Sequence, residues 1–393
     1  MTLFVDPSFF ALLAVVVAVA AALGLAERPI RRWGLVVSCA VLVCALFRTP
    51  AQLAALVAFL AVARAAVLWL ARRPEDSARF YAACVLTCAP LACAKVGGVF
   101  GASLMGFLGI SYVTFKALQV VIEVRDGLID RSGLAAFDWL YFLLFFPQFS
   151  SGPIDRSRRF AADAHDVPPR DEYAGLLARG ILLILAGALY KVVLAAVCHR
   201  FYSPAAIGGG PALAELAEQV KDAYAYGLYL FFDFAGYSLM AMGASYCLGI
   251  RCPRNFRAPF VALDMSDFWN RWHITLSTWF RDFVFMRLTR AAMRRRLLGG
   301  NRLAIAQCGL VADMLVMGLW HGLTASYVVY GLYHGVLLAA TEGLERRSGL
   351  WKRLRSRPWF KVIRWFVTLQ LVMLGLAIFS GQVGIVVKGL ING

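Results

Sequence analysis

The chain has 393 residues, of which 61% are hydrophobic and only 16% are charged. A soluble domain of this length carries about a quarter charged residues, so an ordinary soluble protein is excluded. The formal net charge is +17, but the arginines cluster in short loops between apolar runs, which favours membrane topology over nucleic-acid binding.

The apolar runs are long and continuous rather than short and alternating, which excludes a β-barrel and predicts an all-α polytopic membrane protein. Several runs are shorter than the roughly 20 residues that cross a bilayer, so we expect about 10–11 transmembrane or half-membrane helices in a single domain over 1–393. The nine cysteines show no zinc-like spacing, and we expect no metal site. The candidate spans are 7–25, 34–47, 51–71, 80–94, 102–124, 137–150, 174–198, 222–249, 303–321, 325–343 and 365–388.

The basic loops predict the orientation of the chain. Arginines at 28–32 follow the first apolar run, so we expect them in the cytosol and the N-terminus outside. The basic loops at 72–79 and 125–131 fit the same alternation, whereas the one at 156–159 breaks it. We therefore expect 137–150 to dip into the membrane and return without crossing.

The segment 251–302 is basic at both ends and amphipathic in the middle. On helical spacing, Trp269, Trp272 and Leu276 share one face. We therefore expect 258–290 to form an interfacial or re-entrant helical element on the cytosolic side.

The next segment, 303–345, lies between two arginine-rich stretches, which predicts a hairpin that leaves the cytosol and returns. His321 is about 18 residues into this hairpin, or roughly 27 Å along a helix, so it is accessible from the outer side. His273 instead lies on the segment anchored to the cytosolic side.

Ionisable residues inside membrane segments usually face a cavity or a partner. His321, between Trp320 and Gly322, is either a base that takes a proton from a hydroxyl or a core histidine bonded to a carbonyl. His273 is either functional or an interfacial histidine.

Three further residues have a structural and a functional interpretation. Asp233 is expected to pair with an Arg or Lys of another segment rather than to act in catalysis. Lys116 is either the partner of a buried acid or a side chain that extends to a headgroup. His334 lies on a different helical face from His321 and is expected to be structural. Composition alone leaves a transferase, a transporter and a scaffold open.

Five motifs occur in order: FLGISYVTFKALQ, FFP followed by SGPIDRSRRF, YLFFDFAGYS, FWNRWHITLSTWFRD and MGLWHG. Together they resemble the membrane-bound O-acyltransferases (MBOAT family), with the motifs concentrated in 107–335. The details are most similar to the D-alanyl-transferring, DltB-type members, while alginate O-acetyltransferase-type members share the overall pattern. The resemblance implies an MBOAT-type helical core that includes re-entrant segments.

The resemblance also implies an activity. A D-alanyl group on the 4'-phosphopantetheine arm of a cytosolic carrier protein would pass to an extracytoplasmic hydroxyl of teichoic acid, lipoteichoic acid or a related envelope component, with no tightly bound cofactor. The alternatives are O-acetylation of an envelope polysaccharide and non-catalytic transport. The implied partners are a small acidic carrier protein, other envelope D-alanylation proteins and membrane lipid, and the implied location is the cytoplasmic membrane.

Site residues follow from the same resemblance. His321 matches the catalytic histidine, acting as general base, and His273 matches the second histidine. Expected tunnel-lining or supporting residues are Asp233, Lys116, Trp320, Asn270, Trp269 and Ser111. Expected carrier-protein contacts, for which plain positive-inside topology is an equal explanation, are Arg287, Arg290, Arg294, Arg295 and Arg296.

Overall fold

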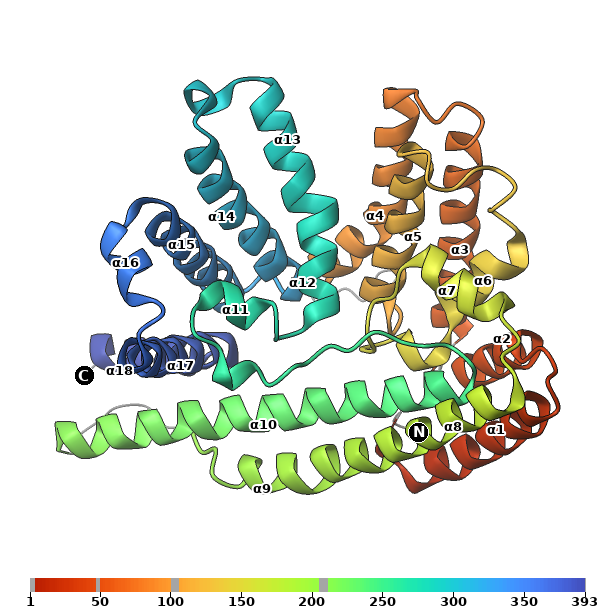
Figure 1. Ribbon diagram of the computed structural model, residues 1–393, viewed down its shortest axis with the longest axis horizontal. Helices are drawn as coiled ribbons and strands as arrows, with labels where there is room; N and C mark the ends of the chain where they lie inside the picture. Colours follow the sequence, from red (N-terminus) through yellow and green to blue (C-terminus); the bar gives the residue numbers. More distant parts are fainter. Residues whose placement is uncertain (1–3, 47–49, 100–105, 205–210, 393) are drawn as a thin grey trace. The chain divides into compact units, whose positions relative to one another are not determined.

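The computed structural model describes residues 4–46, 50–99, 106–204 and 211–392 (Figure 1). Within these ranges the regular structure is entirely helical. Six helical segments of the described residues are long and apolar enough to cross a membrane, which makes this a multi-pass membrane protein. They are Pro7–Leu25, Pro50–Leu70, Ser77–Val99, Arg170–His199, Arg302–His321 and Pro358–Ser380.

The chain divides into two compact units. The first comprises Met1–Leu189 and Gly236–Arg254, and the second comprises Tyr190–Ala235 and Asn255–Gly393. Helix α10 (Ala212–Cys247) contributes to both. The single domain expected from the sequence stays a prediction.

The first unit contains the N-terminal helices. In Figure 1, α3, α4 and α5 lie side by side, and α1 packs along α8. The helices of this unit are α1 (Pro7–Leu25), α2 (Arg31–Val41), α3 (Pro50–Leu70), α4 (Ser77–Val99), α5 (Ile110–Arg125), α6 (Ala136–Leu144), α7 (Ser157–His165) and α8 (Arg170–Ala188), with a π-helical turn at Leu42–Leu46 and a 3₁₀ turn at Phe146–Gln148.

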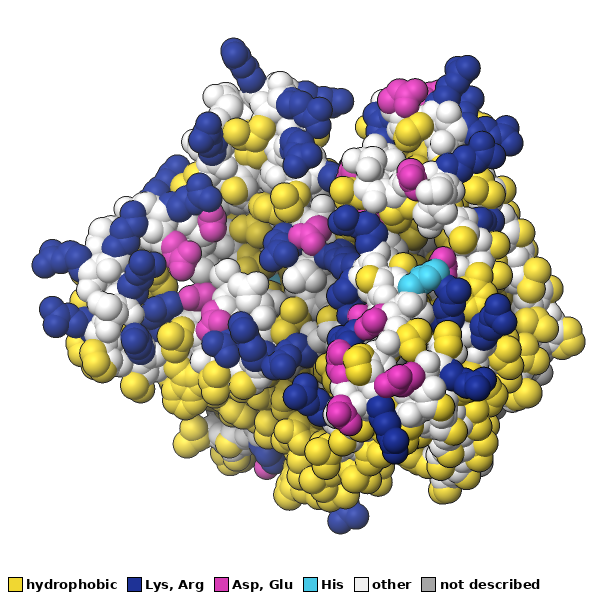
Figure 2. All heavy atoms as spheres, turned by 45° about the vertical axis from the view of Figure 1, so that its right-hand side comes forward, with side chains coloured by type: hydrophobic (Ala, Val, Ile, Leu, Met, Phe, Trp, Pro, Cys, Tyr) yellow, Lys and Arg dark blue, Asp and Glu magenta, His cyan; other side chains and the backbone are white. Residues whose placement is uncertain are grey.

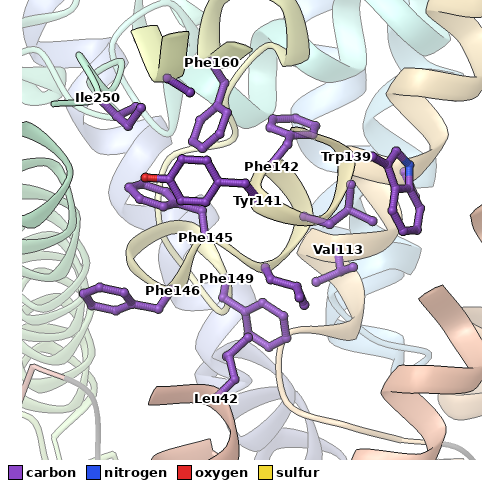
Figure 3. Packing of buried hydrophobic residues seen from close by; sticks show 14 of the residues in the cluster. Leu42, Val113, Trp139, Tyr141, Phe142, Phe145, Phe146, Phe149, Phe160 and Ile250 are labelled. Atoms are coloured by element: carbon purple, nitrogen blue, oxygen red, sulfur yellow. The ribbon is translucent and has the colours of Figure 1, made fainter. Parts of the chain in front are cut away.

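Aromatic side chains of α6, the turn after it and α7 fill the core of the first unit (Figure 3). The rings of Tyr141 and Phe145 each lie 5.1 Å from the ring of Phe160. Helix α6 has nine residues and advances only roughly 13 Å, too little to cross a bilayer. This agrees with the prediction that 137–150 does not cross.

The second unit contains the C-terminal helices and the short ones before them. Its helices besides α10 are α9 (Ala195–His199), α11 (Met265–Trp269), α12 (Ile274–Phe280), α13 (Met286–Arg294), α14 (Arg302–His321), α15 (Ala325–Arg347), α16 (Gly349–Leu354), α17 (Pro358–Ser380) and α18 (Gln382–Asn392). A π-helical turn, Arg281–Phe285, joins α12 to α13, and 3₁₀ turns lie at Pro259–Val261 and Leu297–Gly300.

Helices α14 and α15 form the hairpin that the sequence predicts, and they touch through their backbones. A Cβ atom on Gly331 would lie 2.6 Å from the carbonyl oxygen of Met314, and one on Gly318 would collide with the carbonyl oxygen of Tyr327. Small residues allow this close approach, as is common between membrane helices. At the other end, the Asn301 side chain caps α14 by accepting hydrogen bonds from two backbone N–H groups.

The segment 258–290, expected to form one helical element, is divided into short helices, and the expected single helical face of Trp269, Trp272 and Leu276 is wrong. His273 has left-handed dihedral angles (φ 43°, ψ 49°), so the chain breaks between α11 and α12. The break is stabilised by Ile274 N–H, which donates to Asn255 O at 2.8 Å, and by Arg257 N–H, which donates to Arg271 O at 3.0 Å.

Several predicted spans differ from the observed helices. Predicted span 80–94 lies within the longer α4, and 365–388 is divided at Gly381, where φ is 85°. Helix α5 begins at Ile110, and the earlier part of predicted span 102–124 includes residues outside the described ranges.

Candidate active site

His321 is the last residue of α14, and its ring lies among aromatic side chains from three helices. Its ring centroid lies 4.5 Å from that of Trp320, 5.0 Å from Phe379 of α17 and 5.9 Å from Tyr327 of α15, with which it stacks. His321 is only half-buried. A substrate can therefore reach an imidazole that rigid helices hold in place.

His273 lies at the break between α11 and α12 and is only 4% exposed. Its ring packs edge-on against Phe234 of α10 at 4.6 Å, and its Nε2 atom has no hydrogen-bond partner among the described residues. A non-glycine residue with this backbone conformation is strained, and such strain concentrates at functional sites.

The two histidines belong to the same unit. His321 is accessible to a substrate, whereas His273 is buried. The unit therefore contains one accessible base and one buried polar group. An imidazole in apolar surroundings can take a proton from a hydroxyl, and a second N–H donor nearby can stabilise developing negative charge.

Two other predicted residues flank the break before His273. Trp269 is buried, with its ring 5.2 Å from that of His334, and Asn270 donates through its side-chain amide to Ser266 O at 2.9 Å. His334 is 1% exposed among aromatic rings, as expected of a structural residue, and neither ring nitrogen has a hydrogen-bond partner in the described part of the chain.

Asp233 forms the ion pair that the sequence predicts. Its carboxylate lies 2.5 Å from the Nζ atom of Lys191, which belongs to the π-helical turn Leu189–Leu194. Asp233 is in α10, so the pair joins two segments within the second unit. The carboxylate therefore has a structural partner, as expected of a residue outside the catalytic pair.

Lys116 and Ser111 belong to α5 of the first unit, and their predicted role beside the histidines stays a prediction. Lys116 is fully buried and donates from Nζ to the backbone oxygen of Phe142 at 2.9 Å. The expectation that it extends to a headgroup is wrong, because the side chain ends inside the helical core. The other interpretation, that Lys116 is the partner of a buried acid, stays a prediction, and the fully buried Asp155 belongs to the same unit.

The five arginines predicted to contact a carrier protein lie on α13 and the turn after it. Arg287 is half-buried, whereas the other four are exposed. Figure 2 shows dark blue Lys and Arg side chains gathered at the turn between α13 and α14. This is a cationic surface suited to an acidic partner.

Sequence reasoning missed three residues of this region. Tyr327 and Phe379 surround His321, but aromatic residues in apolar runs carry no signal that separates them from ordinary core. Asp313 is 7% exposed within the apolar α14, and a lone carboxylate in such a run is a signal that could have found it. Within the described ranges, no group of His, Cys, Asp and Glu is arranged to hold a metal ion.

Known proteins are similar to this chain over most of its length. The sequence model of the membrane-bound O-acyltransferase family matches residues 108–379. The chain is 40% identical over 282 residues to a teichoic acid D-alanyltransferase of Bacillus subtilis (strain 168), which covers 71% of this chain and 70% of that protein. It is 39% identical over 322 residues to a teichoic acid D-alanyltransferase of Streptococcus thermophilus, covering 77% and 75%.

More distant relatives are named for a different activity. The chain is 31% identical over 284 residues to a probable alginate O-acetylase of Pseudomonas aeruginosa, which covers 70% of this chain but 49% of that protein. The family match spans most of the chain and includes both histidines. This chain therefore belongs to the membrane-bound O-acyltransferase family and is an acyltransferase.

Proposed function

We propose that the chain transfers a D-alanyl group from a thioester on the 4'-phosphopantetheine arm of a carrier protein to a hydroxyl of teichoic acid outside the cytoplasmic membrane. The relatives near 40% identity are named for D-alanyl transfer to teichoic acid, whereas the alginate-type relatives are near 31%. The observation that carries the proposal is the pair of histidines, one accessible and one enclosed, within one unit.

In the proposed reaction His321 takes the proton of the acceptor hydroxyl. The hydroxyl oxygen attacks the thioester carbonyl carbon, the C–S bond breaks, and the proton passes to the departing thiolate. The products are an oxygen ester and a free thiol. His273, through an N–H, stabilises the negative charge that develops on the carbonyl oxygen.

The proposal also assigns a side of the membrane to each part of the chain. By the positive-inside rule, the N-terminus lies outside and the turn between α13 and α14 lies in the cytosol. The carrier protein approaches that turn, steered by the arginines at 287–296. Other envelope D-alanylation proteins and membrane lipid are the remaining proposed partners.

The first test is His321→Ala in the full chain, reconstituted in liposomes with a D-alanyl-loaded carrier protein. We expect the rate of ester formation to fall by about 10²–10⁴-fold, because the base is lost. His165→Ala removes an exposed histidine of the first unit and is the matched control. An unchanged rate in His321→Ala contradicts the assigned base, and transfer of acetyl but not D-alanyl groups favours the alginate-type activity.

The second test reverses the charge of the α13–α14 turn, with Arg294, Arg295 and Arg296 replaced by Glu. We expect the KM for carrier-bound donor to rise at least about ten-fold at low salt, and the KM for a free pantetheine thioester to stay unchanged. Equal effects on both donors contradict a carrier-docking role.

A further inference from the structure

The segment 346–361 of the second unit is strongly cationic, and we call it the α16 elbow. It comprises the end of α15, all of α16 and the start of α17 (Figure 1). The segment contains no Asp or Glu. Its Lys and Arg side chains are all exposed except those that belong to no more than a contact within the elbow: Arg346, Arg347, Lys352, Arg353, Arg355, Arg357 and Lys361 are each exposed.

Most of this positive charge is not neutralised within the described part of the chain. Arg346 forms an ion pair with Glu342 at 2.5 Å, and the Nζ atom of Lys352 donates a hydrogen bond to the backbone oxygen of Arg346 at 2.9 Å. The other cations of the elbow form no ion pair with a described residue. The elbow can therefore bind an anion from outside the chain without first breaking ion pairs of its own.

Exposed apolar side chains lie among these cations. Leu350 is 66% exposed and Trp359 is 54% exposed. Helix α17, which is long and apolar enough to cross a membrane, begins at Pro358, so the elbow lies at the level of the lipid headgroups. Tryptophan is enriched at this level because its ring contacts both acyl chains and headgroups. Cations together with exposed tryptophan at a span boundary favour a lipid over a soluble partner.

Contacts within the second unit hold the elbow in place. Arg364 of α17 forms an ion pair with Asp264 at 2.6 Å, and its guanidinium group lies 4.9 Å from the ring centroid of Trp351 in α16. The ring of Trp351 also packs edge-on against Phe360 of α17 at 5.6 Å. Helix α16 is therefore fixed against α17 before any lipid binds, and a preorganised surface loses less conformational entropy on binding.

We infer that the α16 elbow binds the headgroup of an anionic phospholipid in the cytosolic leaflet. Clusters of about four to eight Lys and Arg residues next to a membrane span are typical of such binding, and the positive-inside rule places the elbow on the cytosolic side. The exposed guanidinium groups donate hydrogen bonds to phosphate oxygens, while Leu350 and Trp359 contact the glycerol and the first methylene groups. This binding goes beyond the proposed transfer reaction and does not depend on which acyl group is transferred.

The test measures lipid binding to the purified full chain in a neutral detergent by native mass spectrometry. The chain should bind phosphatidylglycerol more tightly than phosphatidylcholine with the same acyl chains. Arg353→Gln/Arg355→Gln should weaken phosphatidylglycerol binding by about 25-fold, or about five-fold for each cation, and leave phosphatidylcholine binding unchanged. Arg353→Lys/Arg355→Lys, which keeps both charges, should retain most of the preference.

The matched control is Arg72→Gln/Arg73→Gln, which removes two exposed cations that follow α3 in the first unit. Glu75 and Asp76 belong to the same loop, and Asp76 forms an ion pair with Arg79. Because acids are present in this loop, its neutralised variant should bind phosphatidylglycerol as tightly as the parent chain.

Three outcomes overturn the inference. The first is a parent chain that does not prefer phosphatidylglycerol. The second is an equal loss of phosphatidylglycerol binding in the two Gln variants, because the cations then act only in membrane orientation. The third is an elbow variant that binds phosphatidylglycerol normally but has a higher KM for carrier-bound donor, because the elbow is then a second carrier-docking surface. Since binding is measured without turnover, a chain that binds the lipid but transfers no D-alanyl group contradicts the proposed function alone.

Discussion

The contact between α14 and α15 predicts a strong effect of the smallest possible substitution, Gly331→Ala. The added methyl group would lie 2.6 Å from Met314 O and 3.0 Å from the Cα atom of Leu315, about 1 Å closer than van der Waals contact. Both neighbours are backbone atoms, so no side chain can rotate away and the helices must separate. We expect a loss of about 1–3 kcal/mol in the free energy of unfolding.

The matched control is Gly175→Ala in α8. No heavy atom lies within 4 Å of a Cβ placed there, so the same methyl group is accommodated. Since alanine favours helix over glycine, this variant should gain about 0.5–1 kcal/mol. Unfolding of both purified variants by SDS titration measures the difference, and equal stability of the two variants would refute the reasoning.

Two further predictions concern ion pairs. In a double-mutant cycle, Lys191→Met and Asp233→Asn should each destabilise the protein. The double variant should lose less than the sum of the two, with a coupling of about 0.5–1 kcal/mol in SDS unfolding because Asp233 is 34% exposed, and strict additivity contradicts a stabilising ion pair. Asp155→Asn removes the fully buried partner of Arg159 and should cost about 2–3 kcal/mol, less than a fully buried pair because Arg159 is 35% exposed. An Asp155→Asn variant as stable as the parent chain in the same titration would show that the pair is not stabilising.

The sequence predicts the helices where long apolar runs lie between charged stretches. The hairpin of α14 and α15 follows from two apolar runs between arginine-rich stretches, and Asn301 is a recognisable cap. The break at His273 could not be predicted, since no glycine or proline marks it and the pairing with Asn255 is a tertiary contact. Helix propensity alone predicts that the helix continues through His273, and for this reason Trp269, Trp272 and Leu276 were expected to share one helical face.

The site was predictable in its residue types but not in its surroundings. A histidine at the end of an apolar run is unusual enough to notice, and the same holds for Asp233. Which lysine would pair with Asp233 depends on how segments far apart in sequence pack. Lys116 shows the limit, because the sequence does not reveal that a backbone carbonyl accepts its hydrogen bond.

The glycine contacts between α14 and α15 have a consequence for the position of His321. A Cβ atom on Gly318, Gly331 or Gly335 would collide with the backbone of the opposite helix, so the two backbones touch and α14 cannot slide along α15. His321 ends α14 three residues after Gly318. The hairpin therefore fixes the position of the imidazole along the helix axis, although the residue lies at a helix end where backbones usually fray.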